Sequence, residues 1–250
     1  MLSDAPSSQT LLVIGGTRGL GLAIARKLAA PGMTLFLNYV ADDASAAAAA
    51  RAVAAAGATA HLIRADAATP AGAAAIIAAT AGGSARLDAI IHCAGIASPG
   101  LLVEQDLQTI QRTIEVGGMS LLYVVRAALP LLARDSSVIY LSGGSVDTPA
   151  PGGGARAMAK ALGECMVRCL VAECAQRAIN FNTFRSGPVD TGVFRAAAGS
   201  AGALPAVTLT AEQLDVDDVA NAVALLLSPA ARMIRGQTIR VDGGLSLKRP

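Results

Sequence analysis

The sequence predicts a single α/β domain in which a parallel sheet of seven strands lies between two layers of helices. Short apolar runs alternate with longer helical stretches along nearly the whole chain, and no break in composition marks a second domain within the 250 residues. Strands buried on both faces read as continuous apolar runs, and a helix between two of them returns the chain to begin the next strand in parallel. Right-handed crossovers then produce a doubly wound fold.

Seven segments are expected as strands because they are short, apolar and rich in β-forming residues. In chain order they are Thr10–Gly15, Met33–Tyr39, Ala58–Arg64, Leu87–His92, Ser137–Ser142, Ala178–Phe184 and Thr238–Val241. The helices expected between them include Gly19–Ala30, Asp42–Ala56, Glu115–Ala133, Arg156–Ala175 and Val216–Leu227. Pro70 and Asp217 favour helix starts, and Gly57 favours a helix stop.

The composition predicts a large buried core and no membrane span. Hydrophobic residues make up 53% of the chain and charged residues 15%. Much of the apolar content is alanine, which favours close-packed helices. The most apolar long stretch, Met119–Ala133, is shorter than a span of about 20 residues and is interrupted by Arg126. Since no leader-like segment precedes the first strand, we expect a cytoplasmic protein with no membrane contact.

Residues 10–250 are expected to form the single domain, preceded by a loose N-terminal segment and carrying a mobile lid. Residues 1–9 are polar, include Pro6, and should be loose. The Ala/Gly-rich stretch Arg195–Ala206 has few side chains able to pack, so we expect it to form part of a mobile lid over about residues 190–212.

Charge and cysteine usage argue against two classes of function. The net charge is +2, no basic residues cluster, and 3% of residues are aromatic, so the sequence does not predict a nucleic-acid-binding surface. The four cysteines show no C-x-x-C spacing and the chain has only two histidines, so no metal site is expected.

A glycine-rich turn follows the first expected strand and opens the first expected helix. Its sequence is Gly15-Gly16-Thr17-Arg18-Gly19-Leu20-Gly21. Glycines let backbone N–H groups approach a pyrophosphate closely, and the helix N-terminus adds partial positive charge. The turn therefore predicts a dinucleotide site, although glycines also serve ordinary tight turns.

The spacing of Gly15, Gly19 and Gly21 resembles the glycine triplet of the short-chain dehydrogenase/reductase family, with Ile14 in place of the Thr that usually opens the motif. The resemblance covers essentially the whole chain. It includes Asp66 after the third strand, His92-Cys93-Ala94-Gly95 after the fourth, the loop Gly187-Pro188-Val189-Asp190-Thr191, and Gly236-Gln237 with Val241-Asp242-Gly243-Gly244 near the C-terminus.

The resemblance implies a Rossmann-type fold and 3-oxoacyl-reductase-like activity on a small-molecule or acyl-thioester ligand. Relatives of this kind assemble as dimers or tetramers through two long helices, here 115–133 and 156–175, with like or unlike chains. The implied cofactor-binding residues are Gly15, Thr17, Arg18, Gly19, Leu20, Gly21, Asn38, Asp66, Ala67, Ala94, Gly95, Lys160, Gly187, Val189 and Thr191.

The choice of cofactor depends on the end of the second strand. Binders of NAD(H) place an acid there to hold the ribose diol. Here the strand ends Leu37-Asn38-Tyr39, while Arg18 in the glycine turn could bind a 2′-phosphate. We therefore expect NADP(H) rather than NAD(H). Asp42 and Asp43 are expected to cap the next helix.

The catalytic positions depart from the family pattern. The resemblance places Lys160 at the family's Lys, but Arg156, Gly143 and Gly117 at its Tyr, Ser and Asn. A guanidinium stays protonated and cannot deliver and recover a proton. Ser142 and Ser145 lie near the Ser position, and a one-residue shift in alignment could restore a hydroxyl there. The candidate catalytic residues are Lys160, Arg156 and Ser142.

Two questions about nearby groups stay open at this point. Strand alternation predicts Tyr140 on the opposite face from Gly143 and hence away from the reaction. Arg156 and Lys160 are four residues apart on one helical face. Arg156 is either solvated or paired with an acid, or the two cations attract an anionic group such as a carboxylate or phosphate.

Three functions are consistent with these residues. The first is an NADP(H)-dependent oxidoreductase of atypical mechanism, and the second is a non-catalytic dinucleotide-binding partner of an active homologue. The third and weakest is a cofactor or redox sensor.

Overall fold

The computed structural model describes residues 9–191, 208–210 and 212–247. Of the residues 1–9 that were expected to be loose, 1–8 lie outside the described residues, as does the Ala/Gly-rich stretch 195–206. In the described part of the chain, no helix is long and apolar enough to cross a membrane.

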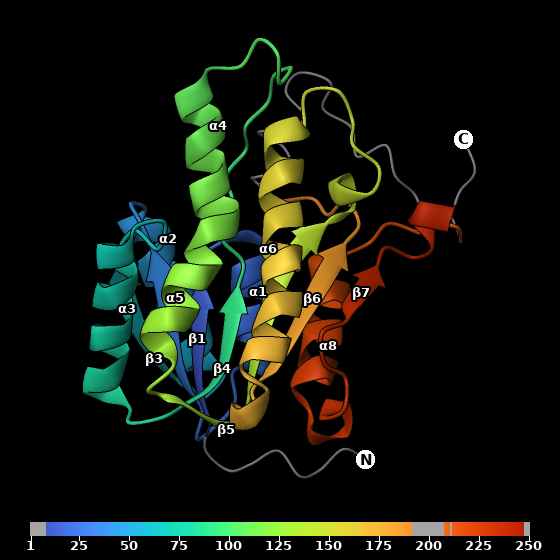
Figure 1. Cartoon of the computed structure of the whole chain (residues 1–250). Coiled ribbons are helices and arrows are strands. Elements are labelled where there is room, and N and C mark those ends of the chain that lie inside the picture. Colours follow the sequence, from blue (N-terminus) through green and yellow to red (C-terminus); the bar gives the residue numbers. More distant parts are fainter. Residues whose placement is uncertain (1–8, 192–207, 211, 248–250) are drawn as a thin grey trace.

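The sheet has the predicted number of strands, all parallel, in the order β3-β2-β1-β4-β5-β6-β7. The strands are β1 Thr10–Ile14, β2 Thr34–Tyr39, β3 Thr59–Arg64, β4 Leu87–His92, β5 Leu132–Gly143, β6 Asn180–Ser186 and β7 Thr238–Val241. The strand order reverses between β1 and β4, and such a switch point is where doubly wound sheets bind ligands. The arrowheads in Figure 1 point upward, so the turns after the strands lie in the upper half of the view, beside the start of α6.

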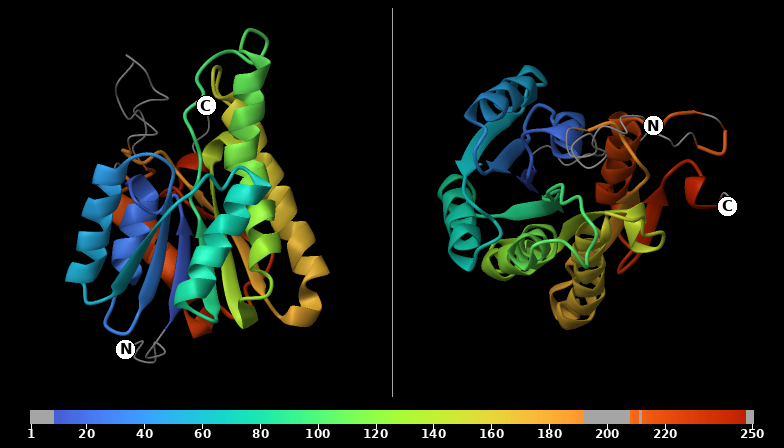
Figure 2. Two further views of the ribbon diagram at one scale, coloured as in Figure 1. Left: turned by 90° about the vertical axis from the view of Figure 1, so that its left-hand side faces the viewer. Right: turned by 90° about the horizontal axis from the view of Figure 1, so that it is seen from above.

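Helices cover both faces of the sheet (Figure 2). One core cluster packs α1 Gly19–Leu28, α2 Asp43–Ala55 and α8 Val216–Leu227 on the sheet. The other cluster packs α3 Pro70–Gly83, α5 Ser120–Ala128 and α6 Gly154–Glu173. Ile139 and Leu141 of β5 belong to the first cluster, whereas Val138 and Tyr140 belong to the second. The alternation predicted for this strand is therefore confirmed.

Capping residues set several helix ends. The Asp42 side chain accepts a hydrogen bond from the backbone N–H of Ser45 at the start of α2, which confirms its predicted role. Pro70 occupies the first turn of α3, as predicted. Gly57 follows α2 with φ +88°, a left-handed conformation that stops a helix. The cap of α8 is Asp215 in a capping box.

The predicted helix 115–133 is wrong at both ends. A helix that the sequence did not predict, α4 (Leu107–Ile114), runs through a π-helical turn at Glu115–Met119 into α5. The turn lies against α6, because a Cβ on Gly118 would come within 2.9 Å of the Ala159 carbonyl oxygen. At the other end the chain leaves α5 at Ala128 and enters β5 at Leu132. Proline at position 130 is the physical reason for this stop.

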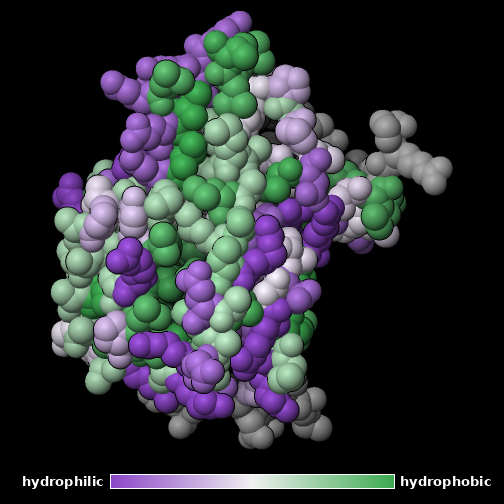
Figure 3. All heavy atoms as spheres, in the orientation of Figure 1, coloured by the Kyte–Doolittle hydropathy of each residue, from purple (hydrophilic) through white to green (hydrophobic). Residues whose placement is uncertain are grey.

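Apolar side chains are exposed over α4 and the loop before it. They gather at the top of Figure 3, and the residues concerned are Leu101, Leu102, Val103 and Leu107. Leu102 also packs on the first turn of α6, because a Cβ on Gly154 would lie 2.5 Å from its side chain.

Candidate active site

The glycine-rich turn between β1 and α1 forms a backbone cradle. Gly15 and Gly19 have φ of +73° and +54°, where other residues are strained. A Cβ on Gly21 would lie 2.1 Å from the carbonyl oxygen of Gly15, so only glycine fits there. Thr17 is buried beneath the turn and Arg18 is exposed beside it. The N-terminus of α1 consequently opens onto a surface that backbone N–H groups line.

The other segments predicted to bind cofactor converge on this cradle. A Cβ on Gly15 would lie 3.3 Å from the Ala94 backbone nitrogen, and one on Gly19 would lie 3.7 Å from the Thr191 Cβ. Residues that are far apart in sequence therefore lie side by side at the carboxyl ends of β1, β4 and β6, the region called the cleft from here on.

Asn38, a predicted cofactor residue, has its side chain engaged within the protein. It is 2% exposed, and its amide donates hydrogen bonds to the carbonyl oxygens of Ile63 and Ala65 at 3.2 and 2.9 Å. The side chain ties the end of β2 to β3.

Asp66 is held by a partner that the sequence reasoning missed. Its carboxylate accepts a hydrogen bond from Arg112 Nη2 at 2.6 Å and another from the backbone N–H of Ala68 at 3.0 Å. Arg112 lies on α4, and the failure to predict that helix hid this ion pair.

The acids after β2 are engaged as well. Asp42 caps α2, and the hydrogen bond from the Ser45 side chain is the main cause that lowers its pKa, with a smaller contribution from Arg18. Asp43 pairs with Arg64 at 3.1 Å and accepts the Tyr39 hydroxyl hydrogen at 2.8 Å. Both carboxylates therefore have local partners.

Lys160 lies at the floor of the cleft. Its side chain is buried, and Nζ donates to the Ala94 carbonyl oxygen at 3.0 Å. A Cβ on Gly95 would lie 3.7 Å from Nζ. Burial lowers the pKa of Lys160 to about 7, and repulsion from Arg156 acts in the same direction. Near neutral pH this amine is therefore poised between its charged and neutral forms.

Arg156 lies over the end of β5, one helical turn before Lys160. Its Nη2 is 3.7 Å from where a Cβ on Gly143 would be, so the groups standing at the family's Tyr and Ser positions face each other. The side chain is half-buried, and burial lowers its pKa. Among the described residues, none forms a hydrogen bond or ion pair with its guanidinium. The alternative that Arg156 pairs with a nearby acid is not supported.

Ser142 and Ser145 differ in what their hydroxyls contact. Ser142 is buried and donates to Glu164 Oε1 at 2.5 Å, beneath α6. Its hydroxyl is therefore committed to the interior. Ser145 lies on a 3-10 turn, Gly144–Val146, and its hydroxyl oxygen is buried with no partner in the described residues. Of the two candidates, Ser145 has the uncommitted hydroxyl.

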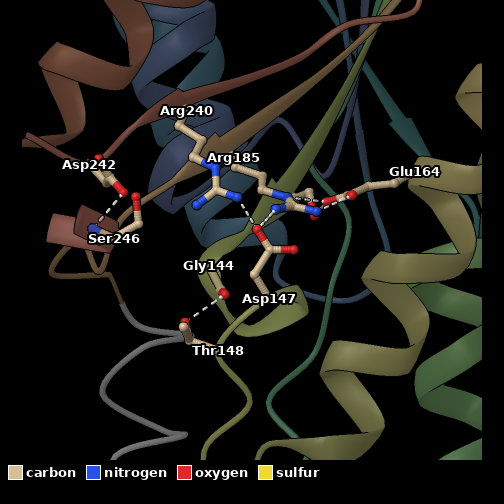
Figure 4. Close-up of polar contacts among 9 residues, drawn as sticks. Gly144, Asp147, Thr148, Glu164, Arg185, Arg240, Asp242 and Ser246 are labelled. Atoms are coloured by element: carbon tan, nitrogen blue, oxygen red, sulfur yellow. Dashed lines mark hydrogen bonds and ion pairs between the residues drawn. The ribbon is translucent and has the colours of Figure 1, made fainter. Parts of the chain in front are cut away.

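An ionic network that sequence reasoning missed runs from the buried Glu164 and Arg185 to the exposed Asp147 and Arg240 (Figure 4). Arg185 on β6 is hydrogen-bonded to both oxygens of Glu164 on α6, and its Nε lies 2.7 Å from Oε1. Asp147 accepts from both Arg185 and Arg240. The hydrogen bond with Glu164 is the main cause that raises the pKa of Arg185. Two carboxylates thus neutralise two guanidiniums within the network.

The chain's three tyrosines all lie in the described residues, and the hydroxyls of Tyr39 and Tyr140 are engaged within the protein. Tyr140 is fully buried, and its hydroxyl donates to the Gly117 carbonyl oxygen at 2.5 Å. Burial and the charge of Glu164 raise its pKa. Tyr39 is hydrogen-bonded to Asp43, and Tyr123 packs against the core.

His92 and Cys93 do not supply an acid near neutral pH. The His92 Nε2 lies 2.7 Å from the Ser120 hydroxyl, which itself donates to the Val116 carbonyl oxygen, so Nε2 carries the proton. Burial lowers the pKa of His92 to about 3 and raises that of the Cys93 thiol to about 12.

The described residues fit a nicotinamide dinucleotide. The glycine-rich turn, where a Cβ on Gly21 would clash, leaves room for a pyrophosphate against the backbone. The Lys160 ammonium lies beside Ala94 and Gly95 at the other end of the cleft, where it could bind a ribose hydroxyl. No group of metal-ligating side chains occurs within the portion of the chain that the structure describes.

Comparisons with known proteins agree with this geometry. The family model described as enoyl-(acyl carrier protein) reductase matches residues 15–246. An uncharacterized oxidoreductase of Methylorubrum extorquens is 29% identical, over 94% of this chain and 96% of its own length. The 3-oxoacyl-[acyl-carrier-protein] reductase FabG of Staphylococcus aureus is 28% identical, over 95% of this chain and 98% of its own length.

Solved structures are similar over almost the full chain. A short-chain dehydrogenase of Burkholderia cenocepacia in complex with NADP superposes with a TM-score of 0.88 at 28% identity and covers 96% of this chain and 98% of its own. A short-chain dehydrogenase/reductase of Serratia marcescens has a TM-score of 0.88 at 26% identity and covers 97% and 100%. The chain therefore belongs to the enoyl-(acyl carrier protein) reductase family of short-chain dehydrogenases/reductases, and it is an oxidoreductase by family.

Proposed function

We propose that this chain binds NADP(H) and acts on a carbonyl group of the 3-oxoacyl type by weak or altered chemistry that lacks a phenolic acid. One observation carries the proposal: Arg156 stands where the family resemblance places the tyrosine. The hydroxyls of Tyr39 and Tyr140 are engaged elsewhere, and Tyr123 packs against the core.

The residues of the cleft would bind the dinucleotide and stabilise charge on the substrate. The backbone of Gly15–Gly21 binds the pyrophosphate, and Arg18 binds the 2′-phosphate. Lys160 holds the nicotinamide ribose. When bound, the dinucleotide supplies a hydride. Arg156 stabilises negative charge on the carbonyl oxygen but cannot release a proton, so the proton comes from water.

The missing acid sets an expected scale for the reaction rate. A positioned general acid contributes about 10²–10⁴ in rate, or roughly 3–5 kcal/mol of barrier. The loss of a serine donor at Gly143 adds to this cost, although groups that act as one unit are not additive. We therefore propose turnover well below that of a complete reductase.

The preference for NADP(H) is supported by the partners of the acids after β2. Asp42 and Asp43 are engaged in a helix cap and an ion pair, which leaves Arg18 exposed beside the cradle. The relative from Burkholderia cenocepacia was solved with NADP. Replacement of Arg18 by alanine is expected to weaken NADPH binding more than NADH binding, as measured by quenching or enhancement of nicotinamide fluorescence.

An alternative function is a non-catalytic subunit that supports an active homologue in the cytoplasm. Two observations favour it. At the family's Asn position, the carbonyl oxygen of Gly117 already accepts a hydrogen bond from the Tyr140 hydroxyl. On α6, Met158, Cys165 and Cys169 are exposed on the helix through which a second chain would pack. Assembly through segments 115–133 and 156–175, with like or unlike chains, belongs to this proposal.

One experiment separates the two functions. NADPH is titrated by fluorescence, and its oxidation is then followed with a panel of carbonyl compounds that includes acetoacetyl thioesters. Slow oxidation that depends on Arg156 supports the oxidoreductase. Binding without oxidation of any acceptor supports the partner subunit, and the absence of NADPH binding would contradict both.

A further inference from the structure

We propose that Arg156 and Lys160 form a binding site for a carboxylate, so that this cleft binds a free oxo acid more tightly than a neutral ketone or thioester. This inference rests on the proposed function only for the position of the ligand in the cleft. It names a ligand class that the family resemblance does not supply.

The first observation is that Arg156 is half-buried without a partner. The side chain is only partly exposed to solvent, and no described acid pairs with its guanidinium. A charge in such a position is unfavourable unless an opposite charge and hydrogen bonds compensate it. A bound anion would supply that compensation.

The second observation is that the nearby acids are already neutralised. Glu164, one turn beyond Lys160 on the same helix, is engaged by Arg185 and Ser142. Asp147 is shared between Arg185 and Arg240. The network balances two negative charges against two positive charges, so it leaves nothing for Arg156.

The third observation is that the two cations are adjacent. Repulsion from Arg156 contributes to the lowered pKa of Lys160. Two cations four residues apart on one helical face project in the same direction. A single anion placed between them would be attracted by both and would relieve their mutual repulsion.

The shape of the site favours a carboxylate. The planar guanidinium fork matches a carboxylate with two parallel hydrogen bonds. Gly143 has no side chain opposite the fork, where a Cβ would stand 3.7 Å from Nη2. The Ser145 hydroxyl, on the turn that follows Gly143, is buried without a partner in the described residues and adds a potential donor at this end of β5.

Binding should be linked to proton uptake. The amine of Lys160, whose pKa lies at about 7, is largely neutral at pH 8. A neighbouring anion favours its charged form. Acetoacetate binding at pH 8 should therefore take up a fraction of a proton, which calorimetry in buffers of different ionisation enthalpy measures directly. Zero uptake would contradict a role for Lys160 in the site.

The test compares acetoacetate with its methyl ester, which has no charge, on the NADP-saturated protein by isothermal titration calorimetry. The parent should bind acetoacetate at least 10-fold more tightly than the ester. Arg156→Gln should remove that preference, since a charge-assisted hydrogen bond contributes a factor of about 10–100. The matched control is Arg168→Gln, an exposed arginine of the same helix with the same change in net charge.

Three results would overturn the inference: equal affinity for the ester, an unchanged preference in Arg156→Gln, or displacement of acetoacetate by equimolar inorganic phosphate. Thermal unfolding without ligand is an independent check. Arg156→Gln should be at least as stable as the parent, because it removes a half-buried charge that has no partner, and a lower melting temperature would show that Arg156 has an internal partner.

The inference and the proposed function can fail separately. Acetoacetate binding without any oxidation of NADPH would leave the carboxylate site in place and remove the oxidoreductase. Oxidation of NADPH by neutral ketones without acetoacetate binding would do the reverse.

Discussion

Replacement of Glu164 by glutamine should destabilise the protein strongly, because it breaks the buried ion pair with Arg185. The two side chains are 4% and 10% exposed, and Glu164 also accepts the hydroxyl hydrogen of Ser142. Glutamine keeps the shape of the side chain but removes its charge, so Arg185 loses the partner that holds two of its nitrogens.

The magnitude follows from the burial of the pair. Removal of one partner of a buried ion pair costs about 3–5 kcal/mol. Asp147, which is 39% exposed, still contacts Arg185 and should keep the cost near the lower end, about 3 kcal/mol. For a domain of 250 residues this corresponds to a decrease in melting temperature of about 6–12 °C.

The assay is urea unfolding followed by circular dichroism, with Asp147→Asn as the matched control. Asp147 and Arg240 are 39% and 43% exposed, so this control should change stability by no more than about 1 kcal/mol. Addition of Arg185→Met to Glu164→Gln should recover part of the loss, since no unpaired charge then remains. A cost below about 1 kcal/mol for Glu164→Gln would refute the reasoning.

Three further predictions concern the cradle and the buried polar groups. Gly21→Ala should abolish NADPH binding while the protein stays folded, because the new methyl group would lie 2.1 Å from the Gly15 carbonyl oxygen; fluorescence titration measures this. Tyr140→Phe should lower the free energy of unfolding by about 1–3 kcal/mol, because the Gly117 carbonyl loses its donor, and should leave NADPH binding unchanged. The free energy of unfolding should fall as pH decreases from about 6.5 toward 3, because unfolded His92 binds a proton that the folded side chain, with its pKa of about 3, does not.

Each of these predictions has a control. Gly82→Ala, in a helix where a Cβ would meet nothing within 4 Å, should bind NADPH normally and gain up to about 1 kcal/mol of stability. Undiminished binding by Gly21→Ala would contradict the cradle. A loss of NADPH binding in Tyr140→Phe would show that Tyr140 acts on the cleft. For the pH dependence, His92→Asn should flatten the curve between pH 6.5 and 3, and an unchanged curve would assign it to other groups.

The sheet could be predicted from the sequence because its strands are apolar and the turns between them carry glycine, proline or capping residues. All seven expected strands are present, and the cap at Asp42 is confirmed. The α4 helix was missed although Leu107, Ile110 and Ile114 recur at helical spacing behind the cap Asp106, because the apolar loop before it obscures where the helix begins. The π-helical turn at Gly117–Gly118 depends on close contact with α6, which no local pattern reveals.

For the candidate site, the sequence revealed which residue types stand at each motif position but not their partners. Counting along the family pattern assigned Arg156 and Gly143 to its Tyr and Ser positions, and the structure then brought the two positions within contact. The network of Glu164, Arg185 and Asp147 joins a helix, a strand and a turn that are distant in sequence, so only the folded chain brings them together. The burial that shifts the pKa of Lys160 is likewise a tertiary effect.

The most direct test of the central claim is NADPH oxidation by an acetoacetyl thioester in the parent and in the double variant Gly143→Ser/Arg156→Tyr. The structure favours this pair over a variant that also carries Gly117→Asn, because a Cβ at position 117 would lie 3.0 Å from the Ala159 Cβ, whereas position 143 has room. With a phenol and a hydroxyl restored beside Lys160, the rate should rise by at least about 100-fold. A parent that already reduces the thioester as fast as the double variant would contradict the claim that its cleft lacks a working acid.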